Sequence, residues 1–206
     1  MYDLATYVTV DDGEHSFKQI YKIRNNGDYR VILDCLVAMG DDELTDSEKM
    51  ISSLGIFYDD IKGWEDIILL SDNLRDNLID AMMDFVEPNR YDIGYKTNYK
   101  IMDWEEDETI IVAAINNVAH MEIRSVNYLH WWTFLGYYMS IGESVFSTVV
   151  SIRDKSHKGK KLEKWEQKFK KDNPQYFKNK KQMARDKADR EMIMNIWNSG
   201  GANNAE

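Results

Sequence analysis

The side chains that most often carry out chemistry are scarce in this chain, which has four histidines and one cysteine in 206 residues. His120, Glu122 and His130 form the one set that folding could bring together as a metal site, but they lack the i, i+4 histidine pair of a helical zinc motif. The alternative for His130 is a core histidine held by hydrogen bonds. Cys35 lies on a predicted apolar helix face, which favours a small core residue over a nucleophile.

Motifs for binding phosphate or calcium are also missing. Gly159-Lys160-Lys161 lacks the glycine spacing of a phosphate loop, and the acidic run 103–108 lacks the spacing of a calcium loop. A single cysteine excludes a disulfide framework and a multi-cysteine zinc site. We therefore expect no enzyme activity, no cofactor and no bound metal. No apolar run approaches the ~20 residues that span a membrane, so we expect no membrane partner.

The net charge of −10 divides unequally along the chain. Residues 1–122 carry 10 basic and 27 acidic residues, whereas residues 123–206 carry 16 basic and 9 acidic ones. Such asymmetry is typical of a segment that meets an anionic partner, which here is nucleic acid, the protein's own acidic half, or a second copy. The most basic stretch is Arg153 to Lys187, with 14 basic and 5 acidic residues. Nucleic acid is disfavoured as its partner, because no helix-turn-helix or RNA-binding motif accompanies this stretch. The candidate basic contact residues are Arg153, Lys155, Lys160, Lys161, Lys164, Lys168 and Lys171.

Four aspartates, Asp72, Asp76, Asp80 and Asp84, recur every four residues. On a helix they form one acidic stripe, in which neighbouring like charges cost roughly 0.2–0.5 kcal/mol per pair. The stripe is either a solvated face or a docking face for a basic segment. If it is a docking face, the basic segment that it binds could be the protein's own stretch Arg153–Lys187.

The pattern of apolar and polar residues predicts a mainly α-helical fold that starts with a short β-hairpin. Residues 6–10 and 16–23 favour strands, joined at the turn Asp11-Asp12-Gly13. Asp28, Thr45 with Glu48, and Ser71 then provide helix N-caps. Residues 125–142, the most apolar segment, predict a helix buried on two sides, which is either the central helix of the domain or part of an interface. Trp131 and Trp132 within it are either core residues or interface anchors.

Three regions follow from the change in composition. Residues 1–154 are predicted to form a compact helical core domain with the hairpin, and residues 155–198 a basic helical arm. Residues 199–206, which are polar and glycine-containing, are predicted to be a flexible tail.

One motif resembles a known family. Tyr128-Leu129-His130-Trp131-Trp132-Thr133-Phe134 is similar to the Leu-His-Trp-Trp-x-Phe helix of the bacteriophage gene-product-fifteen family. The same family has an acidic residue leading into an Ile-x-Ala-Ala segment, matched by residues 107–114, and a Phe-Ser-x-aliphatic segment ending in arginine, matched by Phe146 to Arg153. The resemblance covers roughly residues 5–180. The candidate core or interface residues that it marks are Tyr128, Leu129, His130, Trp131, Trp132, Phe134 and Phe146.

This resemblance implies a tail assembly chaperone, which binds the phage tape-measure protein, keeps it soluble and assists assembly of the tail tube. The implied partners are the tape-measure protein, the tail-tube protein and further copies of the chain. The implied location is the host cytoplasm during assembly, with absence from the mature virion. Two alternatives remain: a structural tail or connector subunit retained in the virion, and a nucleic-acid-binding accessory protein that uses the basic arm.

Overall fold

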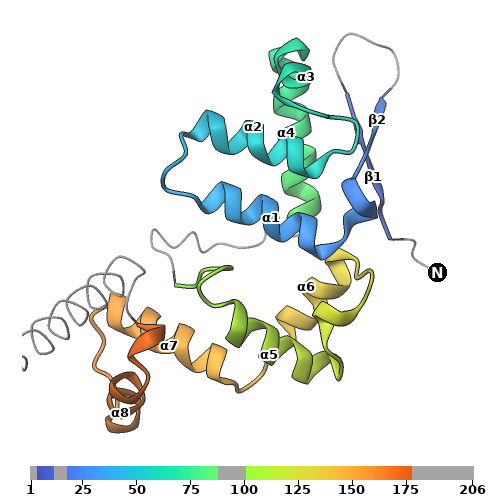
Figure 1. The fold of residues 1–206 in the computed structure, drawn as a ribbon. Helices are drawn as coiled ribbons and strands as arrows, with labels where there is room; N and C mark the ends of the chain where they lie inside the picture. Colours follow the sequence, from blue (N-terminus) through green and yellow to red (C-terminus); the bar gives the residue numbers. More distant parts are fainter. Residues whose placement is uncertain (1–3, 12–17, 88–100, 178–206) are drawn as a thin grey trace, which may run out of the picture. The chain divides into compact units, whose positions relative to one another are not determined.

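The computed structural model describes residues 4–11, 18–87 and 101–177. The chain divides into two compact units, Met1–Phe146 and Ser147–Glu206, which are described separately below. The predicted flexible tail, residues 199–206, and the part of the predicted basic arm after residue 177 lie outside the described residues. Within them the protein is mainly helical and begins with a two-stranded hairpin (Figure 1), which confirms the predicted fold class.

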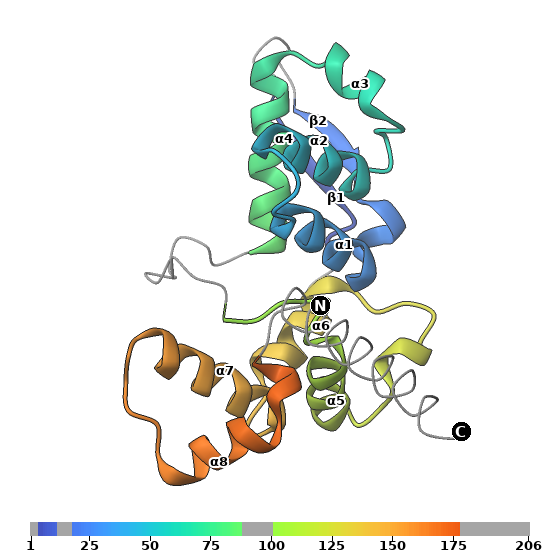
Figure 2. The same ribbon diagram turned by 60° about the vertical axis from the view of Figure 1, so that its left-hand side comes forward.

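The first unit contains ten regular elements in its described residues. In chain order they are β1 (Tyr7–Val10), β2 (Gln19–Lys22), the 3-10 turn η1 (Arg24–Gly27), α1 (Tyr29–Gly40), α2 (Asp46–Phe57), α3 (Trp64–Leu69), α4 (Asp72–Val86), α5 (Glu108–Ala119), the 3-10 turn η2 (Ile123–Ser125) and α6 (Trp131–Met139). Helices α1 and α2 pack together, α4 packs on β1, and α5 packs on α6. Figure 2 shows the hairpin grouped with α1, α2 and α4.

The hairpin is antiparallel, with Val8 opposite Tyr21 and Val10 opposite Gln19. The free edge of β2 is covered by the chain that follows α2. There, Asp59 N donates to Lys22 O at 2.9 Å, and Lys22 N donates to Asp60 Oδ2 at 2.7 Å. The hairpin is therefore tied to the chain after α2 by one backbone hydrogen bond and by one from its backbone to a carboxylate, and α4 packs on β1.

The three predicted N-caps are present. Asp28 accepts from Arg30 N at the start of α1, and Ser71 accepts from Leu74 N at the start of α4. Thr45 and Glu48 form the reciprocal capping box of α2. Each cap satisfies a backbone donor that the first helical turn leaves without a partner, which is why these helices begin where the sequence predicts.

Arg24 stabilises the opposite end of α2. Its guanidinium donates to the carbonyl oxygens of Gly55, Ile56, Tyr58 and Ile61, at 2.8–3.2 Å. The last carbonyls of a helix have no partner within the helix and carry partial negative charge. A single cation therefore closes α2 and orients the chain that leads to α3.

The core of the first unit lies between α1, α2 and α4. Ile32, Leu54 and Leu78 are fully buried there, and the rings of Phe57 and Phe85 meet edge-on with centroids 5.5 Å apart. Cys35 is also fully buried, as predicted, and burial raises the pKa of its thiol to about 12. A thiol with that pKa is protonated at neutral pH and is a poor nucleophile.

The predicted central helix 125–142 is shorter than expected. Helix α6 begins at Trp131, because His130 acts as its N-cap and the residues before it pair with the start of α1. Its two sides are buried to different extents. Trp131 and Phe134 are buried, whereas on the other side Trp132 and Leu135 are half-buried and Met139 is 71% exposed.

The second unit contains most of α7 (Val145–His157), α8 (Lys164–Asp172) and the 3-10 turn η3 (Pro174–Tyr176). Lys155 Nζ on α7 donates to Glu166 Oε1 on α8 at 2.6 Å, and Glu166 is buried. Arg153 donates from Nε to the carbonyl oxygen of Tyr176 at 3.0 Å. These two contacts hold α7, α8 and η3 together. In the described residues of either unit, no helix is long and apolar enough to cross a membrane.

Candidate interaction surfaces

His130 is a structural residue at the centre of the Leu-His-Trp-Trp motif. It is 1% exposed, and its Nδ1 accepts from Trp132 N at 3.1 Å, which caps α6. Its Nε2 lies 2.9 Å from the carbonyl oxygen of Ala5. Since Nδ1 is the acceptor, Nε2 carries the proton and donates to Ala5. One imidazole thus joins the N-terminal segment to α6.

The residues just before α6 pair with the start of α1. Tyr29 N donates to Leu129 O at 2.9 Å, and Leu129 N donates to the Asp28 carboxylate at 3.0 Å. Asp28 is buried and also accepts from the Arg30 guanidinium at 3.1 Å, so its charge is compensated. This pairing explains why the sequence pattern overestimated the length of α6.

The two neighbouring tryptophans hold the end of α4. The indole of Trp131 donates to Val86 O at 2.9 Å, and that of Trp132 donates to Phe85 O at 3.0 Å. Trp131 is buried and Trp132 is half-buried. Both rings therefore take part in folding of the first unit, which is the core alternative considered for them.

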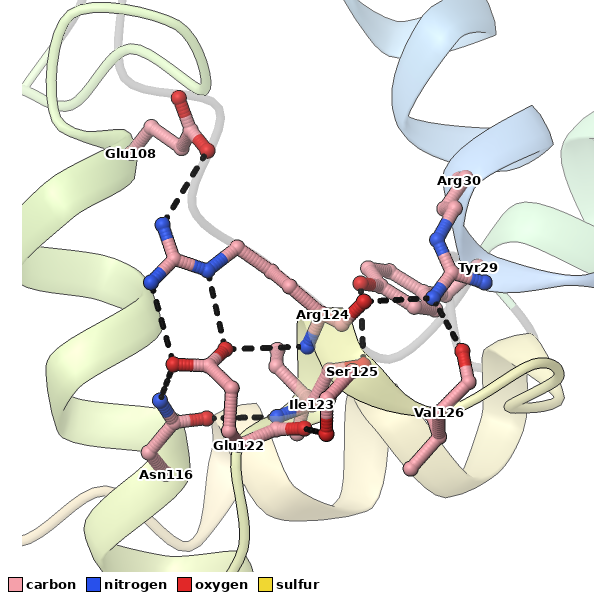
Figure 3. Close-up of polar contacts among 9 residues, drawn as sticks. All are labelled: Tyr29, Arg30, Glu108, Asn116, Glu122, Ile123, Arg124, Ser125 and Val126. Carbon is pink, nitrogen blue, oxygen red and sulfur yellow. Dashed lines mark hydrogen bonds and ion pairs between the residues drawn. The ribbon is translucent and has the colours of Figure 1, made fainter.

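A polar network braces the turn that precedes the motif (Figure 3). The Arg124 guanidinium donates to both carboxylate oxygens of Glu122, at 2.9 and 3.0 Å, and forms an ion pair with Glu108 at 4.0 Å. The side chain of Asn116 on α5 donates to Glu122 at 3.0 Å and accepts from Ile123 N at 2.9 Å. The network joins the turn to α5.

Arg30 joins the same turn to α1. Its guanidinium donates to the carbonyl oxygen of Val126 at 2.6 Å, while its other nitrogen holds Asp28. The hydroxyl of Tyr29 donates to Ile123 O at 3.4 Å. Both residues are drawn in Figure 3. Hydrogen bonds from Arg124, and to a smaller extent Asn116, lower the pKa of Glu122 to about 2. Glu122 is therefore ionised at neutral pH.

The remaining residues of the candidate core set fall into two groups. Leu129, Phe134 and Phe146 are buried. Tyr128 is 45% exposed and donates from its hydroxyl to Asn26 O at 2.9 Å, within a turn whose backbone has positive φ at Asn25 and Asn26. The motif therefore contributes mainly to folding, and Tyr128 is its most exposed member.

The four aspartates of the acidic stripe all lie on the exposed side of α4. Asp72 forms an exposed ion pair with Arg75, one turn further along, at 3.3 Å. The opposite side of α4 is buried through Leu74, Leu78, Met82 and Phe85, as the sequence indicates. The stripe thus lies at the surface of the first unit.

The basic candidates separate into two structural classes. Arg153 and Lys155 are committed to contacts inside the second unit, with Tyr176 and Glu166. The other five are exposed, two in the loop before α8 and three on α8 itself. They are Lys160, Lys161, Lys164, Lys168 and Lys171.

No metal site is assembled from the described residues. His130 is occupied as an N-cap, and His120 ends α5 in a left-handed conformation at the surface. In the part of the chain that the structure describes, no group of three or more histidine, cysteine, aspartate or glutamate side chains is arranged to hold a metal ion.

Helix α3 has an exposed apolar surface that the sequence pattern did not indicate. Trp64, Ile68 and Leu69 are 63%, 59% and 85% exposed, whereas Ile67 is buried and anchors the helix. We call Trp64, Ile68 and Leu69 the α3 ridge. The signal was present in the sequence as the apolar run Ile67 to Leu70, which is too short for its periodicity to separate a buried strand from a surface helix.

The structure is that of a mainly helical protein with charged and apolar helix faces exposed at its surface. The family model described as "Bacteriophage Gp15 protein" matches residues 15–178. The chain therefore belongs to the bacteriophage Gp15 protein family and is a phage structural or morphogenesis protein. Comparison with curated proteins and with solved structures found no match.

Proposed function

We propose that this protein is a tail assembly chaperone, which binds the phage tape-measure protein in the host cytoplasm, keeps it soluble and assists assembly of the tail tube. The observation that carries the proposal is the α3 ridge on a strongly acidic unit. A chaperone for a long helical chain needs an apolar surface that receives the client and a charged exterior that keeps the complex in solution.

The ridge has the geometry of a helix-binding surface. Trp64 and Ile68 are four residues apart and share one side of α3, with Leu69 beside them. Exposed aromatic and aliphatic side chains of this kind are typical anchors of protein interfaces. The ridge therefore suits the apolar side of an amphipathic client helix.

The acidic surroundings indicate the charge of that client. Glu65 and Asp66 are exposed on the first turn of α3, and Asp72 follows the ridge with its side chain 94% exposed. Carboxylates at the rim of an apolar surface favour partners that place Lys or Arg beside their apolar residues. We expect the bound segment to be an amphipathic helix with a basic border.

The size of the ridge favours reversible binding. Full burial of one large apolar side chain contributes about 1.5–3 kcal/mol. Three such side chains contribute less than the ~8 kcal/mol that corresponds to micromolar affinity once the cost of association is subtracted. A single ridge thus gives weak contacts, and stable coating of a client requires several copies.

The direct test is co-expression with the tape-measure protein encoded by the same phage. The wild-type chain is expected to increase the soluble fraction of that protein and to co-purify with it. A W64S/I68S/L69S variant is expected to lose most of this effect. The matched control is I20S/M139S, because Ile20 and Met139 are 68% and 71% exposed but lie elsewhere on the first unit. No gain in client solubility with the wild-type chain would contradict the proposal.

Mass spectrometry of purified virions separates this proposal from a structural tail or connector subunit. A chaperone is expected to be absent from the mature particle. Detection of the chain at a stoichiometry close to that of known tail proteins would support the structural alternative instead.

A further inference from the structure

Helix α8 presents a basic face whose orientation within the second unit is fixed. Its buried side holds Glu166, which accepts from Lys155 at 2.6 Å and from Glu163 N at 2.8 Å. Phe169 meets Phe177 edge-on at 6.3 Å between centroids. These contacts determine which side of α8 remains exposed.

The exposed side combines lysines with one tryptophan. Lys164, Lys168 and Lys171 follow at four- and three-residue steps, so they share one side of the helix. Trp165 beside them is 54% exposed, and its indole donates to Glu163 Oε2 at 2.7 Å. A tryptophan held in place among lysines is suited to an acidic partner that also offers apolar area.

The protein itself contains a surface of that chemistry. Residues 1–146 carry 11 basic and 28 acidic residues, whereas residues 147–206 carry 15 basic and 8 acidic ones. The aspartates of α4 repeat every four residues on its exposed side, next to apolar residues such as Ile79 and Met83 that are only half-buried. Charge complementarity thus selects α4 of a second copy as the occupant of the α8 face.

The spacing of the charges also agrees. Asp76 and Asp80 are four residues apart, as are Lys164 and Lys168, and four residues advance about 6 Å along a helix. Two lysines of α8 can therefore meet two aspartates of α4 when the helices lie alongside one another. Trp165 then covers the apolar side chains between the aspartates.

We propose that the protein self-associates through contact of the α8 face of one copy, formed by Lys164, Trp165 and Lys168, with the exposed face of α4 of a second copy. The two faces differ, so in a pair of copies one α8 face and one α4 face remain for contact with further copies. Such heterologous contacts generate rings or open arrays. The proposal goes beyond the chaperone role and does not depend on the α3 ridge.

Charge reversal tests the contact. Light scattering of the full chain at about 0.05 M salt is expected to show a mass that rises with protein concentration, and association is expected to weaken at about 0.5 M salt because exposed ion pairs are screened. K164E/K168E and D76K/D80K, each alone, are expected to weaken association at least about tenfold. W165A is expected to weaken it while leaving the salt dependence in place.

Mixing distinguishes contact between copies from every other effect of charge. The two reversed variants are expected to associate with one another, because the acidic α8 of the first variant complements the basic α4 of the second. The matched controls are K160E/K161E, in the loop before α8, and D42K/E143K, at exposed loop positions that are not part of α4. Both controls are expected to associate like the wild type, and circular dichroism verifies that every variant is folded.

Three results would overturn the proposal. One is a monomeric wild-type chain at low salt. Another is a mixture of folded reversed variants that fails to associate. The third is wild-type-like association of K164E/K168E together with loss of binding to a single-stranded oligonucleotide, which would assign the α8 face to nucleic acid.

Discussion

At the scale of single residues, Gly27 is a position where the backbone conformation and the close neighbours both require glycine. Its φ is +74°, and an added Cβ would lie 3.0 Å from the Phe85 ring and 3.2 Å from Nε2 of His130. Both neighbours are buried and held by other contacts, so they have little room to move. The glycine lets the η1 turn pass beside the imidazole that links Ala5 to α6.

Substitution of glycines at two positions is therefore expected to have opposite effects. Gly27→Ala should lower the free energy of unfolding by more than ~1–2 kcal/mol, the cost of a Cβ in the left-handed region alone. Gly55→Ala is the matched control, because Gly55 lies inside α2 with nothing within 4 Å of an added Cβ. That change should raise stability by about 0.5–1 kcal/mol. Urea unfolding of both variants measures the difference, and equal effects would contradict the role of Gly27.

At the scale of elements, local signals predicted the structure well where they were self-contained. The caps at Asp28, Thr45 and Ser71 lie within three residues of the donors that they satisfy, so the sequence alone located three helix starts. The start of α6 was missed because His130 caps it while Leu129 pairs with residues about a hundred positions earlier. A pairing at that separation leaves no periodic signal.

The candidate surfaces also divide into those that follow from a local sequence repeat and those that only the fold reveals. The acidic stripe is a regular repeat, and its exposure on α4 follows from the apolar residues on the opposite side. The α3 ridge depends on which member of an apolar run is anchored, and only the fold reveals that Ile67 is that member. Likewise, composition could not separate Arg153 and Lys155, which hold the second unit together, from the lysines that remain exposed.

The polar network of Glu122, Arg124 and Asn116 around η2, which we call the η2 brace, predicts how stability depends on pH. The folded-state pKa of Glu122 is about 2, below its ordinary value of 4.5, mainly because Arg124 donates to it. A lowered pKa means that the carboxylate stabilises the fold above pH ~4.5 and that this contribution is lost as the pH falls towards 2.

Glu122→Gln is thus expected to be less stable than the wild type at neutral pH, with a difference that shrinks as the pH falls from ~4.5 to ~2. Urea unfolding over a pH series measures it. Glu143→Gln, at an exposed loop position, controls for loss of one negative charge. A stability difference that is constant with pH would rule out the brace as its source.

At the scale of the whole molecule, the division into two compact units predicts that a defect in one unit is felt mainly there. The second unit is held by the ion pair between Lys155, whose side chain is 35% exposed, and buried Glu166, and the hydrogen bond from Lys155 lowers the pKa of Glu166. Replacement of Glu166 by Gln removes the charged acceptor of this hydrogen bond, and charge-assisted hydrogen bonds are roughly twice as strong as neutral ones.

Glu166→Gln is accordingly expected to reduce amide hydrogen-exchange protection by at least about tenfold in α7 and α8, with little change in α1 and α4. Lys158→Gln is the matched control, because its pair with Asp154 at 2.8 Å is at the surface and exposed pairs contribute only about 0.3–0.5 kcal/mol. Equal loss of protection in both units would show that the two units unfold together. In that case the position of α8, on which the proposed self-association depends, would not be stabilised by the second unit alone.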